Sequence, residues 1–126
     1  MTSPAELADR VEELARDDFN IDMEIYKVVQ PAAFERSLNN LLDSPIGPRL
    51  GQADYDGYIR APAYTASLDA AETLVPENCK QCWAAGWGVD GRAFATIGFE
   101  RSRYAATPAL ALCAAALRAM EPCGIM

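Results

Sequence analysis

Histidine, the usual general base near neutral pH, is absent from all 126 residues of the sequence. Its absence removes the Ser–His and Cys–His nucleophile pairs and the commonest metal ligand. Adjacent carboxylates occur at Glu12 and Glu13 and again at Asp17 and Asp18. Both pairs fall on or near an expected helix end, where solvation or capping accounts for them. The sequence therefore predicts a protein that is not an enzyme.

The four cysteines include one Cys-x-x-Cys motif, formed by Cys79 and Cys82. A redox pair of the thioredoxin kind lies at a helix N-terminus, whereas Cys82 is expected to enter a strand. A four-cysteine zinc site normally has two close pairs, but Cys113 and Cys123 are expected far apart, one inside a helix and one in the tail. We therefore predict free thiols, with no metal and no cofactor.

Tryptophan and arginine side chains of the C-terminal half are the best candidates for binding a small ligand. Arginine pairs with phosphate, tryptophan stacks on a base, and a helix N-terminus favours an anion. A structural role remains open, in which the tryptophans fill a hairpin core and the arginines lie in solvent. The candidate ligand-binding residues are Trp83, Trp87, Arg92, Arg101 and Arg103, the last two shortly before the final expected helix.

The formal net charge of −7 belongs mainly to the N-terminal half. Residues 1–60 carry 12 acidic and 6 basic side chains, whereas residues 61–126 carry 6 and 5. This balance argues against direct binding to a nucleic-acid backbone, which needs clustered Lys and Arg. The acidity either keeps a small protein soluble or attracts a basic partner protein. The candidate partner-binding residues are Glu12, Glu13, Asp17, Asp18 and Asp22.

Three helices are expected to position these acidic residues. Ser3 and Glu6 form a capping box, so the first helix is predicted to run to about Arg16. Apolar residues then repeat at helical spacing over 21–29 and again over 34–42. We treat residues 1–43 as an N-terminal helical segment.

A connector over residues 44–62, rich in Pro, Gly and Tyr, is predicted to separate this segment from a C-terminal unit at 63–126. In that unit Ser67 is expected to cap a short helix that ends before Pro76. Thr107 is expected to cap a final, alanine-rich helix.

Two β-rich runs, Cys82–Val89 and Arg92–Glu100, flank the dipeptide Asp90-Gly91, which suits a type I′ turn. They predict a β-hairpin. On the first strand, one face is expected to carry Trp83, Ala85, Trp87 and Val89. On the second strand, one face is expected to carry Ala93, Ala95, Ile97 and Phe99. The predicted fold class is α+β, with a helical N-terminal segment followed by a helix–hairpin–helix unit whose antiparallel sheet packs with helices.

Two stretches around the hairpin carry a family resemblance. Residues 62–71 read Pro-Ala-Tyr-Thr-Ala-Ser-Leu-Asp-Ala-Ala, and residues 105–117 begin Ala-Ala-Thr-Pro-Ala-Leu-Ala-Leu-Cys. In this order they resemble the phage ABA-sandwich domain family, small proteins of phages and prophages. The resemblance covers about half of the chain and implies an antiparallel sheet with helices on its faces. It implies no reaction and carries over no functional residues.

Related small phage proteins include counter-defence factors, some of which sequester cyclic nucleotide signals. We therefore expect a phage or prophage counter-defence inhibitor that docks its acidic surface on a host defence complex, such as a CRISPR effector. One alternative is an oligomeric sponge for a cyclic nucleotide, with the tryptophans stacking and the arginines contacting phosphates. A second alternative is an accessory structural phage protein.

The expected location is the cytoplasm of the host bacterial cell. The longest apolar stretch, 105–120, is interrupted and shorter than the roughly 20 residues that span a bilayer. The N-terminus turns acidic at Glu6 and lacks the order of a secretory signal. The exposed edges of the hairpin or the alanine-rich helix could pair across a two-fold axis, so a homodimer or higher oligomer is expected.

Overall fold

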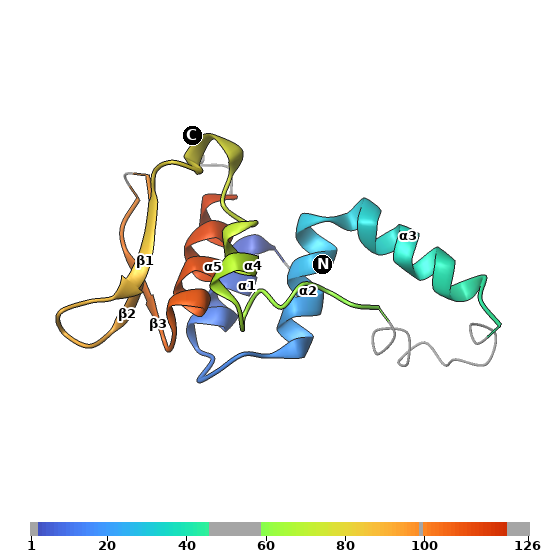
Figure 1. Cartoon of the computed structure of the whole chain (residues 1–126), viewed down its shortest axis with the longest axis horizontal. Helices are drawn as coiled ribbons and strands as arrows, with labels where there is room; N and C mark the ends of the chain where they lie inside the picture. The colour runs from blue at the N-terminus through green and yellow to red at the C-terminus, as the bar shows by residue number, and fades with distance from the viewer. Residues whose placement is uncertain (1–2, 46–58, 99, 121–126) are drawn as a thin grey trace.

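The computed structural model describes residues 3–45, 59–98 and 100–120. Its fold class is α+β, as predicted, with a three-stranded antiparallel sheet in the order β1-β2-β3 that packs against helices (Figure 1). The elements in chain order are α1 (Pro4–Glu12), α2 (Phe19–Val29), α3 (Pro31–Leu42), α4 (Leu68–Glu72), the 3-10 turn η3 (Glu77–Cys79), β1 (Trp83–Trp87), β2 (Ala93–Ile97), β3 (Arg103–Ala105) and α5 (Pro108–Ala119).

The described helices all lie on one side of the sheet (Figure 1). Helix α5 packs on the sheet, mainly against β2 and β3, and α1 and α4 pack against α5. Helix α2 contacts α1, and α3 contacts α2 and points away from the sheet. The opposite face of the sheet therefore carries no helix from the described part of the chain.

Helix α5 forms the centre of the hydrophobic core. Nine consecutive residues of α5, from Ala109 to Leu117, are buried, because the sheet covers one side of the helix and α1 and α4 cover others. A helix that is apolar all round is suited to such a central position. The alanine-rich helix therefore offers little exposed surface for pairing two copies, and the expected oligomer stays a prediction.

The helix starts follow the predicted capping signals. Side-chain oxygens of Ser3, Asp18, Ser67 and Thr107 each accept a hydrogen bond from a backbone N–H in the first turn of α1, α2, α4 and α5. Helix α1 ends at Glu12, earlier than predicted. The chain leaves the helix there because it must turn to bring the Asp18 N–H to a tertiary partner.

The hairpin is present, but its turn differs from the prediction. A type I′ turn needs positive φ at both central residues, and Asp90, like every described residue other than glycine, has a negative φ. Gly88 N–H donates to the Arg92 carbonyl at 2.8 Å, and Gly91, at φ +84°, donates to the Gly88 carbonyl at 3.0 Å. The loop therefore has three residues and ends in a left-handed glycine, the next most common hairpin connection.

The predicted alternation along the strands is confirmed on β2, where Ala93, Ala95 and Ile97 are all buried. Their neighbours on β1 share that face but are less covered, and Trp87 is 62% exposed. Phe99 lies outside the described residues. Strand β3 was not predicted, because three residues that include Arg103 give little strand signal.

A buried hydrogen-bond network ties α2 to the segment before α4. The Asp22 side chain, 6% exposed, accepts hydrogen bonds from both the N–H and the hydroxyl of Thr65, each at 2.8 Å. The Thr65 hydroxyl oxygen also accepts a hydrogen bond from the Asp18 N–H at 2.9 Å. One threonine therefore satisfies polar groups at both the cap and the first turn of α2.

We predict that Thr65→Val lowers the free energy of unfolding by about 1–3 kcal/mol, because it leaves Asp22 and the Asp18 N–H with lost partners. Thr65→Ser, the control, keeps the hydroxyl and removes only a methyl group, worth about 0.8 kcal/mol. Urea denaturation followed by tryptophan fluorescence measures both. Equal losses in the two variants would mean that the hydroxyl network does not stabilise the fold.

The stability of the protein should depend on the pH through Asp22. Burial raises the pKa of Asp22 above its ordinary 3.8, partly offset by the two bonds from Thr65. A raised pKa means that the folded state binds the proton more tightly, so the wild type should lose stability relative to Asp22→Asn as the pH rises from 3.8 through the raised pKa. Paired denaturation curves across this range measure the difference, and a constant difference would contradict the prediction.

Candidate functional site

The five candidate acidic residues do not form one free acidic surface. Glu12 binds Arg118 of α5 through both carboxylate oxygens, at 2.9 and 3.1 Å. Asp18 caps α2, and Asp22 is buried against Thr65. Glu13 and Asp17 remain exposed. Three of the five therefore have partners within the fold, and two are exposed.

The ion pairs of Arg118 hold α1 against α5. Its guanidinium contacts Asp9 as well as Glu12, and these two acids raise the pKa of Arg118. Glu12, which the sequence offers as part of a docking surface, is thus neutralised by a base 106 positions away. Sequence periodicity gives no signal for a contact across that separation.

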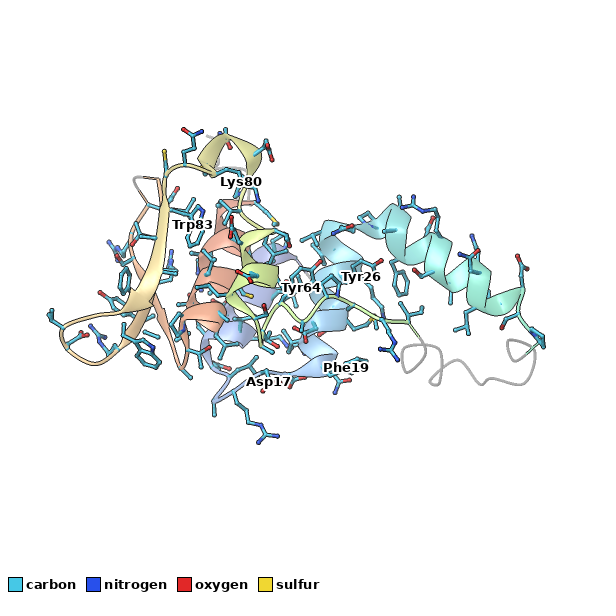
Figure 2. All side chains as sticks on the ribbon, in the orientation of Figure 1. Asp17, Phe19, Tyr26, Tyr64, Lys80 and Trp83 are labelled. Atoms are coloured by element: carbon cyan, nitrogen blue, oxygen red, sulfur yellow. The ribbon has the colours of Figure 1, made fainter. Side chains whose placement is uncertain are left out.

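The tryptophan and arginine candidates are not brought together. Trp83 turns toward α5 and packs against the core (Figure 2). Trp87 lies exposed at the far end of the same strand. Arg92 forms a 2.8 Å ion pair with Asp90 and stacks over the Tyr104 ring, 4.0 Å from its centroid. This separation argues against one base-stacking and phosphate-binding pocket.

The sequence position of Arg101 and Arg103 suggested that they lie at the N-terminus of α5. Instead, both lie beside the C-terminal half of that helix. The reason is β3, in which Arg103 pairs with Ala95 before the chain runs along the edge of the sheet to the start of α5. The hollow they line with Glu100, Ala115, Arg118 and Ala119 has a volume of about 10 Å³. That space holds about one water molecule and no nucleotide.

Two larger hollows are open depressions of the surface. One, of about 460 Å³, has Cys79 and Cys82 in its wall. The other, of about 410 Å³, lies between Arg16 and the start of α5 at Thr107. Neither contains a candidate tryptophan or Arg101 or Arg103, so neither supports the predicted ligand site.

The face of the sheet that no described helix covers carries a group of side chains, of which the sequence had singled out only Arg92. We call it the outer sheet face, formed by Ala84, Gly86, Arg92, Phe94, Thr96 and Tyr104. The Phe94 ring lies over Gly86, 3.9 Å from where a Cβ would stand, and Tyr104 is 43% exposed beneath the Arg92 guanidinium. Alternation along β2 places Phe94 outward, but Tyr104 could not be found because β3 was not predicted.

Arg92 is held in a defined position on this face. Its side chain donates to Asp90, which lowers the pKa of that carboxyl group, while its guanidinium covers Tyr104. An arginine fixed over an aromatic ring presents its remaining N–H groups at low entropic cost. The geometry suits contact with a protein surface.

Comparison with known proteins adds no relative: no family model matches the chain, and neither a curated protein nor a solved structure matches it. No helix in the described ranges is long and apolar enough to cross a membrane. Within those ranges, no group of three or more His, Cys, Asp or Glu side chains is placed to hold a metal ion.

The cysteines are predicted to differ sharply in reactivity. Cys82 is exposed and Cys79 partly exposed, whereas Cys113 is buried with its Sγ donating to the Tyr64 carbonyl at 3.0 Å, and burial raises the pKa of Cys113. Iodoacetamide should therefore alkylate Cys79 and Cys82 in the native protein and Cys113 only after unfolding. Peptide mass mapping measures this. Rapid native labelling of Cys113 would contradict the placement of α5.

Proposed function

We propose that this protein is a non-enzymatic inhibitor that docks on a partner protein through the outer sheet face. The observation that carries the proposal is the one-sided sheet, whose uncovered face holds Phe94, Tyr104 and Arg92. Aromatic residues and arginine are enriched among the side chains that dominate binding energy at protein interfaces. The outer sheet face, and not the acidic helices, is then the main contact, because three of the five candidate acids on those helices have partners within the fold.

The partner class we propose is a host defence complex, such as a CRISPR effector, met in the bacterial cytoplasm. Two features support it: the resemblance to small phage proteins, and the net charge of −7, which favours approach to a basic protein surface. Glu13 and Asp17, which stay exposed, would add to this long-range attraction. A nucleotide sponge has less support, since Trp83 and Trp87 lie apart from the hollow that Arg101 and Arg103 line.

Expression of the chain in bacteria that carry single defence systems should restore phage plaquing on at least one strain. Tyr104→Ala should abolish that restoration and weaken binding to the purified defence complex at least about tenfold. Phe19→Ala is the matched control, because Phe19 is a similarly exposed aromatic, 53% against 43%, on α2 away from the sheet (Figure 2). The control should bind as the wild type does.

The same assay separates this surface from the acidic one. The double variant Glu13→Lys and Asp17→Lys should slow association and reduce its dependence on salt, while leaving most of the affinity. Loss of binding in this variant, with Tyr104→Ala unaffected, would move the interface to the acidic helices. Tight binding of a cyclic nucleotide by calorimetry, with no effect on any defence complex, would overturn the docking proposal.

A further inference from the structure

Among the residues that the structure describes, strand β1 lies at an edge of the sheet and lacks the features that usually prevent edge strands from pairing. The sequence from Cys82 to Val89 has no charged residue and no proline, and the register of β1 with β2 runs without a bulge. Natural sheets commonly protect their edges with charge, proline, bulges or short strands. The other edge strand, β3, is protected in this way, since it has three residues and includes Arg103.

The backbone groups that β1 leaves unused follow from its hydrogen bonds to β2. In an antiparallel pair, directly opposed residues alternate between bonded and non-bonded pairs. Gly98 N–H donates to the Cys82 carbonyl, and Gly88 N–H donates to the Arg92 carbonyl, so the even-numbered residues of β1 point their backbone groups toward β2. The N–H and C=O groups of Trp83, Ala85 and Trp87 therefore point away from the sheet.

Alternate residues of β1 read the same in both directions about its centre. The strand is Trp-Ala-Ala-Gly-Trp, in which only Ala84 and Gly86 do not match, so an antiparallel copy centred on Ala85 sets Trp83 opposite Trp87 and Ala85 opposite itself. A two-fold interface requires such self-complementarity, because if residue i of one copy contacts residue j of the other, residue j of the first copy also contacts residue i of the second. The same three residues whose backbone groups are unused form the bonded pairs in this register. The register that matches the side chains of these three residues is thus also the register in which their N–H groups find acceptors.

We propose that two copies of this chain pair through β1, in antiparallel register about Ala85, to form a continuous six-stranded sheet. Each copy would donate three N–H groups and accept three, at Trp83, Ala85 and Trp87. The pairing joins two outer sheet faces side by side, so the inhibitor would present a doubled docking surface. The dimer itself does not depend on the proposed function.

In a single copy, the side of β1 that faces the helices is only partly covered. Helix α5 packs mainly on β2 and β3, and no residue of β1 is fully buried, whereas three are on β2. Trp87 leaves 62% of its side chain exposed on this side. In the proposed register, Trp87 lies directly across from Trp83 of the second copy, and such cross-strand aromatic pairs are favourable. Pairing would therefore cover the largest exposed aromatic of the strand.

Sedimentation of the full chain over a range of concentrations should show a monomer–dimer equilibrium. Ala85→Pro should raise the dimer dissociation constant at least about tenfold, since it removes the N–H at the two-fold axis from both copies. That N–H makes no bond to β2, and proline is tolerated at such an edge position, so the monomer should keep its circular dichroism spectrum. A chain that stays monomeric at all concentrations would overturn the proposal.

A second pair of variants keeps the test decisive if Ala85→Pro fails to fold. Trp87→Glu should weaken the dimer, because it places a carboxylate against the aromatic pair, while its exposed position should leave the monomer fold intact. Val89→Glu is the matched control: Val89 is fully exposed in the loop outside the paired residues. Equal effects of the two variants on dimerisation would contradict pairing through β1.

Amide exchange by NMR identifies the interface directly. In the dimer the N–H groups of Trp83, Ala85 and Trp87 should be protected, and dilution should remove that protection while Ala84 and Gly86 stay protected by β2. A dimer in which the three amides exchange freely would place the interface elsewhere. Protection of all three in a monomer would mean that another segment of the same chain covers this edge. Either result would overturn the proposal.

Discussion

The hydroxyl of Thr65 is the contact on which the arrangement of the helices depends most. It joins Asp18, at the cap of α2, to the buried Asp22 one turn later, and so fixes α2 against the segment that leads into α4. A buried carboxyl group costs free energy unless it is hydrogen-bonded, and Thr65 donates two hydrogen bonds to Oδ1 of Asp22. The chain between α1 and α2 must therefore bend to reach this residue, which explains the early end of α1.

The neighbouring residue links the same segment to the core helix. Tyr64 is buried, and its carbonyl accepts the Cys113 thiol of α5. The two stretches that carry the family resemblance thus meet at this contact, and their caps at Ser67 and Thr107 start α4 and α5. Their residues build the fold. The outer sheet face, which we propose as the docking surface, is formed by other residues.

The sequence located most elements because their signals are local. Caps, apolar spacing and the glycine at the hairpin turn each act within a few residues, so the starts of α1, α2, α4 and α5 were predictable. The turn type was not, because Asp-Gly fits more than one hairpin loop. The candidate site was predicted less well: Arg118 neutralises Glu12 from across the molecule, and β3 moves Arg103 to the other end of α5.

By itself, the sequence determined the fold class, the capped helices, the hairpin and the matching alternate residues Trp83, Ala85 and Trp87, since each is set by residue type and spacing along one segment. Only the tertiary structure decided which of the candidate acids are exposed, which tryptophan is exposed and which face of the sheet the described helices cover. These properties depend on contacts between segments separated by 40 to more than 100 residues, such as Thr65 with Asp22 and Arg118 with Glu12. Local periodicity carries no information about such contacts.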